Sequence, residues 1–324
     1  MNIERPELSI VIPVFNEEGN IDMLVSELIP VISQITHEYE VIFVDDGSKD
    51  KTFEKVKDLN TQNPLINGIS FSKNFGHQTA LLAGLKQSSG EVVISIDGDL
   101  QHPPEMIPEL FQKYNEGFDI VNTKRIDPKG IGLFKKLSSR LFYKLINYLS
   151  DVPIEPAAAD FRLMTRKAVD AYLAIPERDR FTRGLISWIG FRQAIIPYQA
   201  NPRFSGKSKY SLTKMISFGL SGITSFSSRP LRISFYTGLM ISFFGFLYAL
   251  YAIIEYFQGR NVQGWTSILV TLLIIGGLTL INLGIIGEYI ARIFHEVKRR
   301  PAYFIKEATD KKALKDYGEK EEDE

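Results

Sequence analysis

The chain has 324 residues, a formal net charge of zero and no cysteine. Its length allows one large domain plus an appendage, and the neutral charge does not favour binding to nucleic acid. A disulfide framework is excluded, which is typical of a reducing compartment, and the four histidines lack the spacing of zinc ligands. The first seven residues are polar and do not resemble a secretory signal.

The first 125 residues alternate short β-branched runs with amphipathic segments. The predicted strands are Leu8–Val14, Tyr39–Val44, Ile66–Phe71, Val92–Ile96 and Asp119–Thr123. Helices are expected between them, near 20–35, 51–60, 77–87 and 104–115. This alternation predicts an α/β fold with a doubly wound, mostly parallel sheet. Neither a dinucleotide-binding glycine motif nor a P-loop is present, so those two nucleotide-binding classes are not favoured.

Two later segments have helical apolar faces, and in the first of them basic residues occupy the other faces. Residues 131–149 place Phe134, Leu137, Leu141 and Leu145 on one face, a pattern typical of a helix at an anionic membrane surface. An ordinary amphipathic helix packed on the domain would show the same pattern. Residues 212–226 form a second such candidate, directly before an apolar region.

The apolar region contains two windows without Asp, Glu, Lys or Arg, Ile233–Ile254 and Trp265–Gly287. Each exceeds the roughly 20 residues that cross a bilayer, so we predict spans at about 233–257 and 265–287. Two buried core helices are the alternative. Basic residues flank the pair on its outer sides, which predicts that both termini are cytoplasmic. The small residues Gly276, Gly277, Gly284 and Gly287 predict close helix packing, within the hairpin or between protomers. Beyond Lys306 the charged tail is expected to be solvated or disordered.

The most informative stretch, Asp97-Gly98-Asp99-Leu100-Gln101, follows an apolar strand. Two carboxylates about 4 Å apart repel by roughly 4 kcal/mol at an effective dielectric of 20, unless a cation lies between them. Mg²⁺ and Mn²⁺ prefer such oxygen ligands, and the Gln101 side chain offers one more. A solvated turn that caps the next helix is the alternative.

Three other predicted strands also end in polar residues. Pro13-Val14-Phe15-Asn16-Glu17-Glu18 and Asp45-Asp46-Gly47-Ser48 offer an aromatic ring and carboxylates to a nucleoside. In the alternative interpretation, Asn16 and Ser48 are helix N-caps. Ser72-Lys73-Asn74-Phe75-Gly76 offers a cation beside backbone amides, which suits a diphosphate.

Taken together, these motifs resemble the family-two inverting glycosyltransferases with a GT-A fold, and within them the polyprenyl-phosphate group. Asp160-Phe161-Arg162-Leu163-Met164, Arg203-Phe204-Ser205-Gly206-Lys207-Ser208-Lys209-Tyr210 and the paired spans extend the resemblance over roughly residues 7 to 304. Many relatives have Gly where this chain has Ala159, which puts the conformation of that loop in question.

The resemblance implies a role for each candidate residue. Asp97, Asp99 and Gln101 would hold Mg²⁺ or Mn²⁺, with Asp97 also facing the nucleotide. The nucleoside pocket would consist of Pro13, Phe15, Glu17 and Asp46. Cations near the phosphates would be Lys73, Arg125, Arg140, Arg203 and Lys209, with Arg125 and Arg140 on the acceptor phosphate. Asp160 would orient the acceptor or act as a base; alternatively it is a structural partner for Arg162.

We therefore expect a metal-dependent, inverting transfer of a hexose from a nucleotide sugar, UDP-glucose or UDP-N-acetylglucosamine, to polyprenyl phosphate. The expected location is the cytoplasmic face of the inner membrane, with a catalytic domain at 1–228, two spans within 229–290 and a tail at 291–324, in a homo-oligomer. The lipid phosphate is already mostly ionised at neutral pH, so little base catalysis is required. The alternatives are a processive polysaccharide synthase, whose Gln-x-x-Arg-Trp signature is absent, and a non-catalytic scaffold or lipid-translocation partner.

Overall fold

The computed structural model describes residues 6–126, 158–178, 180–199, 226–258 and 264–310, together with residues 144, 147, 148, 201 and 224. The chain divides into two compact units. We call them the sheet unit, residues 1–143, 153–211 and 300–324, and the hairpin unit, residues 144–152 and 212–299. The two units are described separately.

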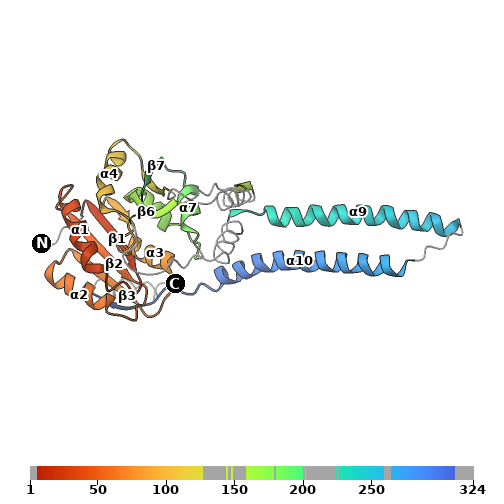
Figure 1. Ribbon diagram of the computed structural model, residues 1–324, viewed down its shortest axis with the longest axis horizontal. Helices are drawn as coiled ribbons and strands as arrows, with labels where there is room; N and C mark the ends of the chain where they lie inside the picture. Colours follow the sequence, from red (N-terminus) through yellow and green to blue (C-terminus); the bar gives the residue numbers. More distant parts are fainter. Residues whose placement is uncertain are drawn as a thin grey trace. The chain divides into compact units, whose positions relative to one another are not determined.

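Four parallel strands form the centre of the sheet unit (Figure 1). They are β1 (Leu8–Val14), β2 (Tyr39–Asp45), β3 (Ile66–Phe71) and β4 (Val92–Ser95). The connecting helices are α1 (Ile21–Ser33), α2 (Thr52–Gln62), α3 (His77–Gln87) and, after a 3₁₀ turn at Pro104–Met106, α4 (Ile107–Asn115). The predicted alternation of strands and helices is confirmed here.

The sheet continues beyond this half, with four more strands and two short helices. They are β5 (Ile120–Arg125), β6 (Ala158–Thr165), β7 (Gln193–Tyr198), β8 (Ile305–Ala308), α6 (Arg166–Leu173) and α7 (Thr182–Trp188). The strand order is β7-β5-β6-β4-β1-β2-β3-β8. Strand β6 runs antiparallel to both of its neighbours, and β8 runs antiparallel to β3. The sheet is therefore mostly parallel, as predicted, but β6, β7 and β8 were not predicted.

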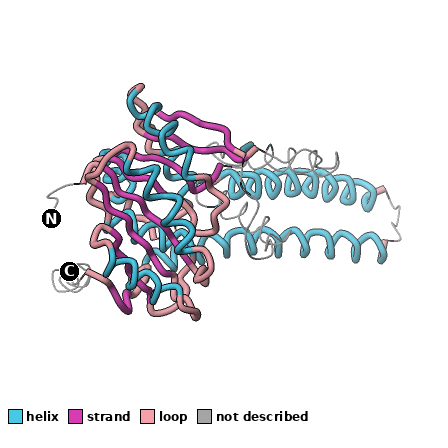
Figure 2. Tube along the Cα trace, turned by 60° about the vertical axis from the view of Figure 1, so that its left-hand side comes forward, coloured by secondary structure: helices cyan, strands magenta, loops and turns pink. Residues whose placement is uncertain are grey.

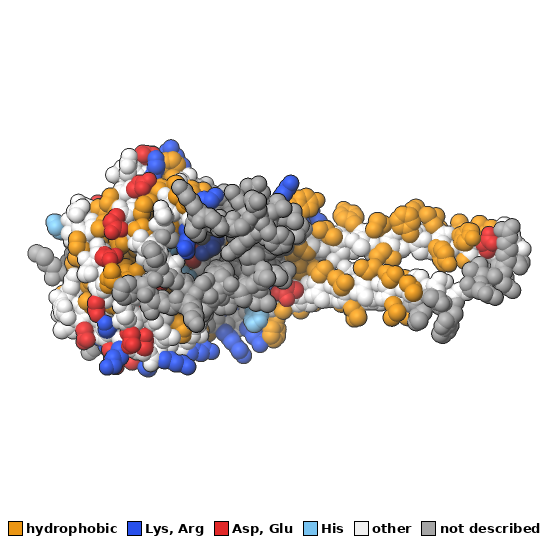
Figure 3. All heavy atoms as spheres, in the orientation of Figure 1, with side chains coloured by type: hydrophobic (Ala, Val, Ile, Leu, Met, Phe, Trp, Pro, Cys, Tyr) orange, Lys and Arg blue, Asp and Glu red, His pale blue; other side chains and the backbone are white. Residues whose placement is uncertain are grey.

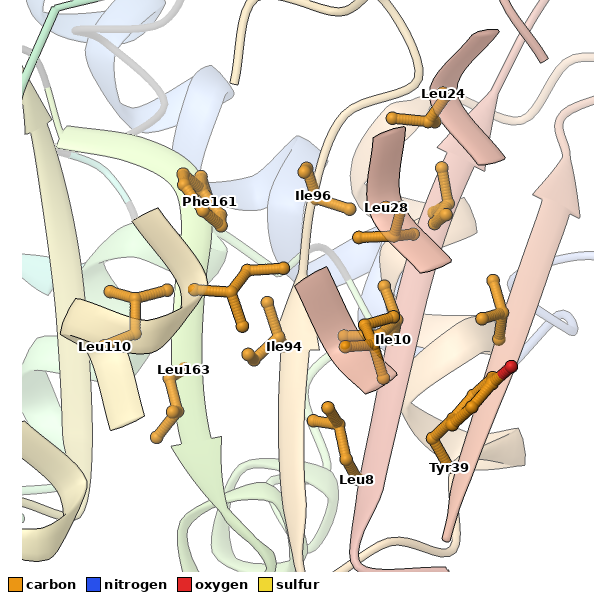
Figure 4. Packing of buried hydrophobic residues seen from close by; sticks show 14 of the residues in the cluster. Leu8, Ile10, Leu24, Leu28, Tyr39, Ile94, Ile96, Leu110, Phe161 and Leu163 are labelled. Atoms are coloured by element: carbon orange, nitrogen blue, oxygen red, sulfur yellow. The ribbon is translucent and has the colours of Figure 1, made fainter. Parts of the chain in front are cut away.

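The main core lies where α1 and α4 pack on the sheet, and most of its side chains are aliphatic, with some aromatic rings such as Phe43 and Phe161 (Figure 4). Leu28 of α1 lies beside Ile10 of β1, and Leu110 of α4 lies beside Leu163 of β6, while Leu24 of α1 belongs to the same core. Each of these five side chains is fully buried. Burying a side chain of this size contributes roughly 1.5–3 kcal/mol, so the core holds the strand ends in a fixed register.

Strand β8 corrects the predicted tail. Ser70 pairs with Glu307, and Thr309 exchanges hydrogen bonds with the backbone of Gly68. The Tyr303 ring stacks on Phe71, with centroids 4.8 Å apart. The prediction that the chain beyond Lys306 lacks structure is wrong for residues 307–310, because these contacts give the charged segment backbone partners at the edge of the sheet.

The hairpin unit contains two long helices, α9 (Arg229–Phe257) and α10 (Trp265–Val297), which lie side by side (Figures 1 and 2). Apolar side chains cover their surfaces (Figure 3), and Phe246 and Leu280 are 67% and 71% exposed. A water-soluble protein rarely exposes so large an apolar surface, and both helices are long and apolar enough to cross a membrane. Buried core helices, the alternative, are excluded. The predicted surface helices at 131–149 and 212–226 lie almost entirely outside the described residues.

Candidate active site

The two aspartates Asp97 and Asp99, which we call the acid pair, lie directly beyond the carboxyl end of β4. Leu100 follows with φ of 62°, a left-handed conformation that costs a non-glycine residue about 1–3 kcal/mol. The sharp turn lets the Asp99 carboxylate accept the backbone N–H of Gln101, at 3.1 Å. Asp97 and Asp99 both line one cavity of about 190 Å³. Both acidic residues therefore border the same cavity.

The same cavity collects the residues predicted to bind a nucleoside. Besides the acid pair, its lining includes Pro13, Phe15, Glu17, Asp46 and His77. Phe15 exposes 38% of its surface although it is aromatic, so its ring is available to a ligand. The structure thus brings together three strand ends, those of β1, β2 and β4, because parallel neighbours end at the same edge of the sheet.

The loops after β1 and β2 are tied to each other. The backbone N–H of Asn16 donates to the Ser48 hydroxyl at 2.8 Å, and the Asn16 side chain accepts from the backbone N–H of Lys49. The backbone N–H of Glu17 donates to Thr52. The alternative interpretation of Asn16 and Ser48 as helix N-caps is therefore wrong, because their side chains link two loops instead. These bonds fix Phe15 and Glu17 on the cavity wall.

Asp46 holds the next loop in place. Its carboxylate accepts the backbone N–H groups of Phe75 and Gly76, at 2.6 and 2.9 Å. Burial raises the pKa of Asp46, although these two hydrogen bonds oppose the shift. Gly47 has φ of 70°, and a Cβ there would lie 2.4 Å from the Lys73 carbonyl carbon. The turn after β2 therefore needs glycine, because the Lys73 loop packs directly on it.

Asp160, on β6, lies at the centre of a cluster of cations. Arg162 donates to Oδ1 at 2.8 Å, and Arg183 contacts both carboxylate oxygens at 3.2 and 3.3 Å. Gln78 donates to Oδ2 at 3.2 Å. Burial raises the pKa of Asp160, but the charge of Arg183, the contact with His77 and the charge of Arg162 outweigh it and hold that pKa well below its ordinary value. The carboxylate is ionised and poorly suited to accept a proton.

His77 joins this cluster to the acid pair. Its Nε2 lies 3.5 Å from Asp97 Oδ1 and 3.5 Å from Asp160 Oδ2. Burial alone lowers the pKa of His77, but the contact with Asp160 and the charge of Asp97 raise it to about 9. At neutral pH the imidazole is charged, so it reduces the repulsion between Asp97 and Asp160.

Gln101 and Lys73, which were predicted to face the metal and the phosphates, have other contacts in the structure. The Gln101 side-chain oxygen accepts a hydrogen bond from Arg125 at 3.0 Å, and Gln101 is buried. Its predicted role as a metal ligand stays a prediction, since an amide oxygen that accepts one hydrogen bond keeps a second lone pair. Lys73 lies over the Phe75 ring at 5.0 Å and does not line the cavity. The predicted residues Arg140, Arg203 and Lys209 lie outside the described residues and stay predictions.

The sequence interpretation missed His77, His102 and Arg183. The Asp97 backbone N–H donates to His102 Nδ1 at 3.2 Å, and the buried His102 ring stacks on Phe161. His77 and His102 each follow a predicted strand within a few residues, as the acid pair does, and that position was an available signal. Arg183 had no such signal, because it begins a short helix far from any predicted strand.

The acid pair fits a hard divalent metal. Among the residues that the structure describes, no three His, Asp or Glu side chains form a metal-binding group on their own. Mg²⁺ in nucleotide sites uses one or two carboxylates and takes its other ligands from phosphates and water. Asp97 and Asp99 supply that number of carboxylates on the wall of one cavity.

A larger cavity, of about 860 Å³, lies elsewhere in the sheet unit. Its charged lining consists of three cations, Lys86, Arg178 and Arg180, and one carboxylate, Glu177. Without a second carboxylate it does not suit a divalent metal. We therefore place the candidate active site at the smaller cavity, beside the acid pair.

Comparisons with known proteins agree over both units. The family model described as "Glycosyl transferase family 2" matches residues 9–173, and "GtrB C-terminal hairpin" matches residues 229–293. An uncharacterized glycosyltransferase of Synechocystis is 43% identical over 300 residues, covering 92% of this chain and 94% of the relative. A prophage-derived bactoprenol glucosyl transferase of Shigella flexneri is 42% identical over 303 residues, 93% of this chain and 98% of the relative. A similar solved structure is glucosyl-3-phosphoglycerate synthase of Mycobacterium tuberculosis in complex with Mn²⁺ and UDP-glucose. Its sequence identity is 19% and its TM-score is 0.44, and the match covers 68% of this chain and 77% of the other chain.

Proposed function

The chain belongs to glycosyl transferase family 2, and we propose that it transfers a hexose from a nucleotide sugar to a polyprenyl phosphate at the membrane surface. One observation carries this proposal: a single cavity is lined by Asp97, Asp99, Phe15 and Asp46. The same chain has two helices that are long and apolar enough to cross a membrane. UDP-glucose is the first donor to test, because relatives at 42% identity are named bactoprenol glucosyl transferases.

On the donor side, Phe15 would stack on the base and Glu17 would accept hydrogen bonds from the nucleoside. The bonds between the loops after β1 and β2 position both residues before the donor arrives. Asp46 would line the inner wall of the pocket while it fixes the loop that carries Lys73. The donor pocket is thus largely preformed, which reduces the ordering cost of binding.

Asp97 and Asp99 would hold Mg²⁺ or Mn²⁺ against the donor diphosphate. A bound divalent cation would offset the negative charge that develops on the leaving diphosphate. His77, charged at neutral pH, lies 3.5 Å from an oxygen of Asp97 and 3.5 Å from an oxygen of Asp160, so it would offset part of their repulsion. We propose that Gln101 acts here through Arg125, whose guanidinium it orients.

The two apolar helices would anchor the enzyme where the lipid acceptor lies. A tethered domain meets a membrane-bound acceptor at a high effective concentration. Arg229 and Arg232 begin α9, and Lys298, Arg299 and Arg300 follow α10, so the charge pattern supports a cytoplasmic sheet unit and cytoplasmic termini. The exposed apolar surfaces of α9 and α10 also suit contacts between protomers.

Transfer would be a direct displacement at the anomeric carbon. An acceptor phosphate oxygen forms the new bond to that carbon, while the bond to the donor diphosphate breaks and the nucleoside diphosphate leaves with the electron pair. Attack from the opposite face inverts the configuration. The acceptor needs little base catalysis because its phosphate is ionised, and Asp160, held ionised by two guanidinium groups, suits an orienting role instead.

The test is transfer by the full chain in membranes or detergent. Radiolabelled UDP-glucose and UDP-N-acetylglucosamine are each incubated with undecaprenyl phosphate and Mg²⁺ or Mn²⁺. Label is expected in the organic phase with at least one donor, and EDTA should abolish it. Absence of lipid-linked label with a wide panel of nucleotide sugars, at saturating metal, would rule the proposal out.

A further inference from the structure

A short segment that follows α10 packs against the loop that leads from β3 to α3. We call this segment, residues 301–310, the C-terminal strap, and residues 72–76 the β3–α3 loop. In sequence, the strap begins directly after residues 298–300, which follow the end of α10. The strap adds β8 to the edge of the sheet, and the pairing continues into the loop, where the Ser72 N–H donates to the Phe304 carbonyl at 2.9 Å. The backbone of the loop is therefore held by a distant part of the chain.

Aromatic rings also join the strap to the loop. The Tyr303 ring stacks on Phe71 with centroids 4.8 Å apart, and the Phe304 ring lies 6.2 Å from that of Phe75. Phe71 and Phe75 meet edge to face at 5.8 Å. These separations are in the range of favourable ring contacts. Tyr303 is buried in the core, whereas Phe304 is 45% exposed, so Phe304 contacts the loop without filling the core.

The β3–α3 loop is tied in turn to the cavity of about 190 Å³ beside the acid pair, the donor cavity. The backbone N–H groups of Phe75 and Gly76 donate to the carboxylate of Asp46, which lines that cavity. His77 follows directly, begins α3 and lines the same cavity. A displacement of Phe75 would therefore disturb both Asp46 and His77.

On the basis of the function proposed above, we propose that Phe304 is a positioning residue for the nucleotide sugar and acts through Phe75. Phe304 itself does not line the donor cavity. Its ring holds the Phe75 ring, and its carbonyl holds the Ser72 N–H. The loop then keeps Asp46 and His77 in place on the cavity wall. A wall that is ordered before the donor arrives binds it at a smaller entropic cost.

The test measures binding of UDP, in the presence of Mn²⁺, to the full-length enzyme in detergent by isothermal titration calorimetry. The variants are Phe304→Ala, Phe304→Tyr, Phe75→Ala and the double variant Phe304→Ala/Phe75→Ala. The matched control is Thr309→Val, because the Thr309 hydroxyl accepts from the Gly68 N–H at 2.9 Å, away from the end of β3 that leads into the loop. The KM values for the UDP-sugar and for undecaprenyl phosphate are measured on the same proteins, and melting temperatures report folding.

We expect Phe304→Ala to raise the Kd for UDP and the donor KM by about 3- to 10-fold, while the KM for undecaprenyl phosphate changes less than about twofold. Phe304→Tyr keeps the ring and should bind UDP as the wild type does, and so should Thr309→Val. Phe75→Ala should also raise the Kd, and adding Phe304→Ala to it should raise the Kd no further. Since Phe304 is half exposed, its loss should lower the melting temperature by no more than about 4 °C.

Three outcomes would overturn the assignment. Unchanged UDP binding by Phe304→Ala would show that the donor site does not need this ring. Equal losses of UDP affinity in Phe304→Ala and Thr309→Val, with lower melting temperatures in both, would make the strap a stabilising element only. Additive effects of Phe304→Ala and Phe75→Ala would show that Phe304 does not act through Phe75.

The binding measurement also separates this assignment from the proposed function. If the wild type binds UDP but labels no lipid with any donor, the proposed transfer is rejected, and the UDP affinities of the variants still decide the role of Phe304. If the wild type binds no UDP, the proposed UDP-sugar donor and the role of Phe304 are both rejected.

Discussion

In the parallel half of the sheet, β1 to β4, the side chains of the candidate site follow the strands, whereas β6 carries its candidate-site charges inside the strand. Asp97 and Asp99 lie on a turn beyond β4, and Asp97 is 31% exposed. Asp160 and Arg162 are residues of β6 itself, and their side chains are 8% and 3% exposed. The first arrangement separates the candidate site from the core of the fold. The second combines the two, because removing one partner of a buried ion pair destabilises the fold.

Asp99→Asn should therefore abolish transfer without unfolding the protein. Loss of one of the two carboxylates that we propose to hold the metal is expected to reduce kcat/KM by about 10³-fold, equivalent to about 4 kcal/mol. Lipid-linked product formation measures the effect, and the melting temperature should stay close to that of the wild type. Asp58→Asn, an exposed change on α2, is the control. Near-normal transfer by Asp99→Asn would place the metal elsewhere.

Asp160→Asn should give the opposite pattern, a large loss of stability as well as activity. It leaves the buried Arg162 charge without its carboxylate, which costs about 3–5 kcal/mol. Denaturant or thermal unfolding in detergent measures this loss. Adding Arg162→Met to the same variant should recover part of the stability, because the unbalanced charge is removed. A stable Asp160→Asn protein would mean that other groups balance Arg162.

Gly47→Ala tests whether the loops of the parallel half must keep their close packing. The new Cβ would lie 2.4 Å from the Lys73 carbonyl carbon and 2.8 Å from the Asn74 nitrogen, at a φ of 70°. We expect a loss of about 1–3 kcal/mol of stability and a raised donor KM. Gly19→Ala is the matched control, because nothing lies within 4 Å of its added Cβ. Equal effects of the two substitutions would contradict the packing argument.

The difference between the parallel strands and β6 also explains which strands could be predicted from the sequence. Strands β1 and β3 were predicted to the residue, because a buried parallel strand is a short β-branched run between turn residues. Strand β6 has charges within it, so its own composition does not predict a buried strand. Strand β8 joins β3 from more than 230 residues away, and no local pattern indicates such pairing.

The candidate site divides in the same way. The acid pair was visible because both carboxylates follow one strand, and Pro13, Phe15 and Asp46 were visible for the same reason. The partners of Asp160 were only partly visible. The alternative that paired it with Arg162 agrees with the 2.8 Å contact, since the two residues are close in sequence. Arg183 and Gln78 come from 23 and 82 residues away, and only the folded chain brings them together.

The smallest predicted effect is a difference in acid stability between the wild type and Asp160→Asn. The pKa of Asp160 in the folded protein lies well below its ordinary value of 3.8, because Arg183, His77 and Arg162 outweigh the effect of burial. In the acid range the unfolded chain therefore binds a proton that the folded chain does not, and the stability due to this carboxylate falls as pH falls. That contribution is complete above about pH 5 and is lost below it, at up to about 1.4 kcal/mol per pH unit.

Asp160→Asn lacks the titrating group, so the gap in melting temperature between it and the wild type should be widest at pH 6 and should narrow towards pH 3. A gap that stays constant over this range would show that the arginines do not lower the pKa of Asp160 in the folded protein. The buried charges of β6 would then not differ in this respect from the exposed carboxylates beyond β4.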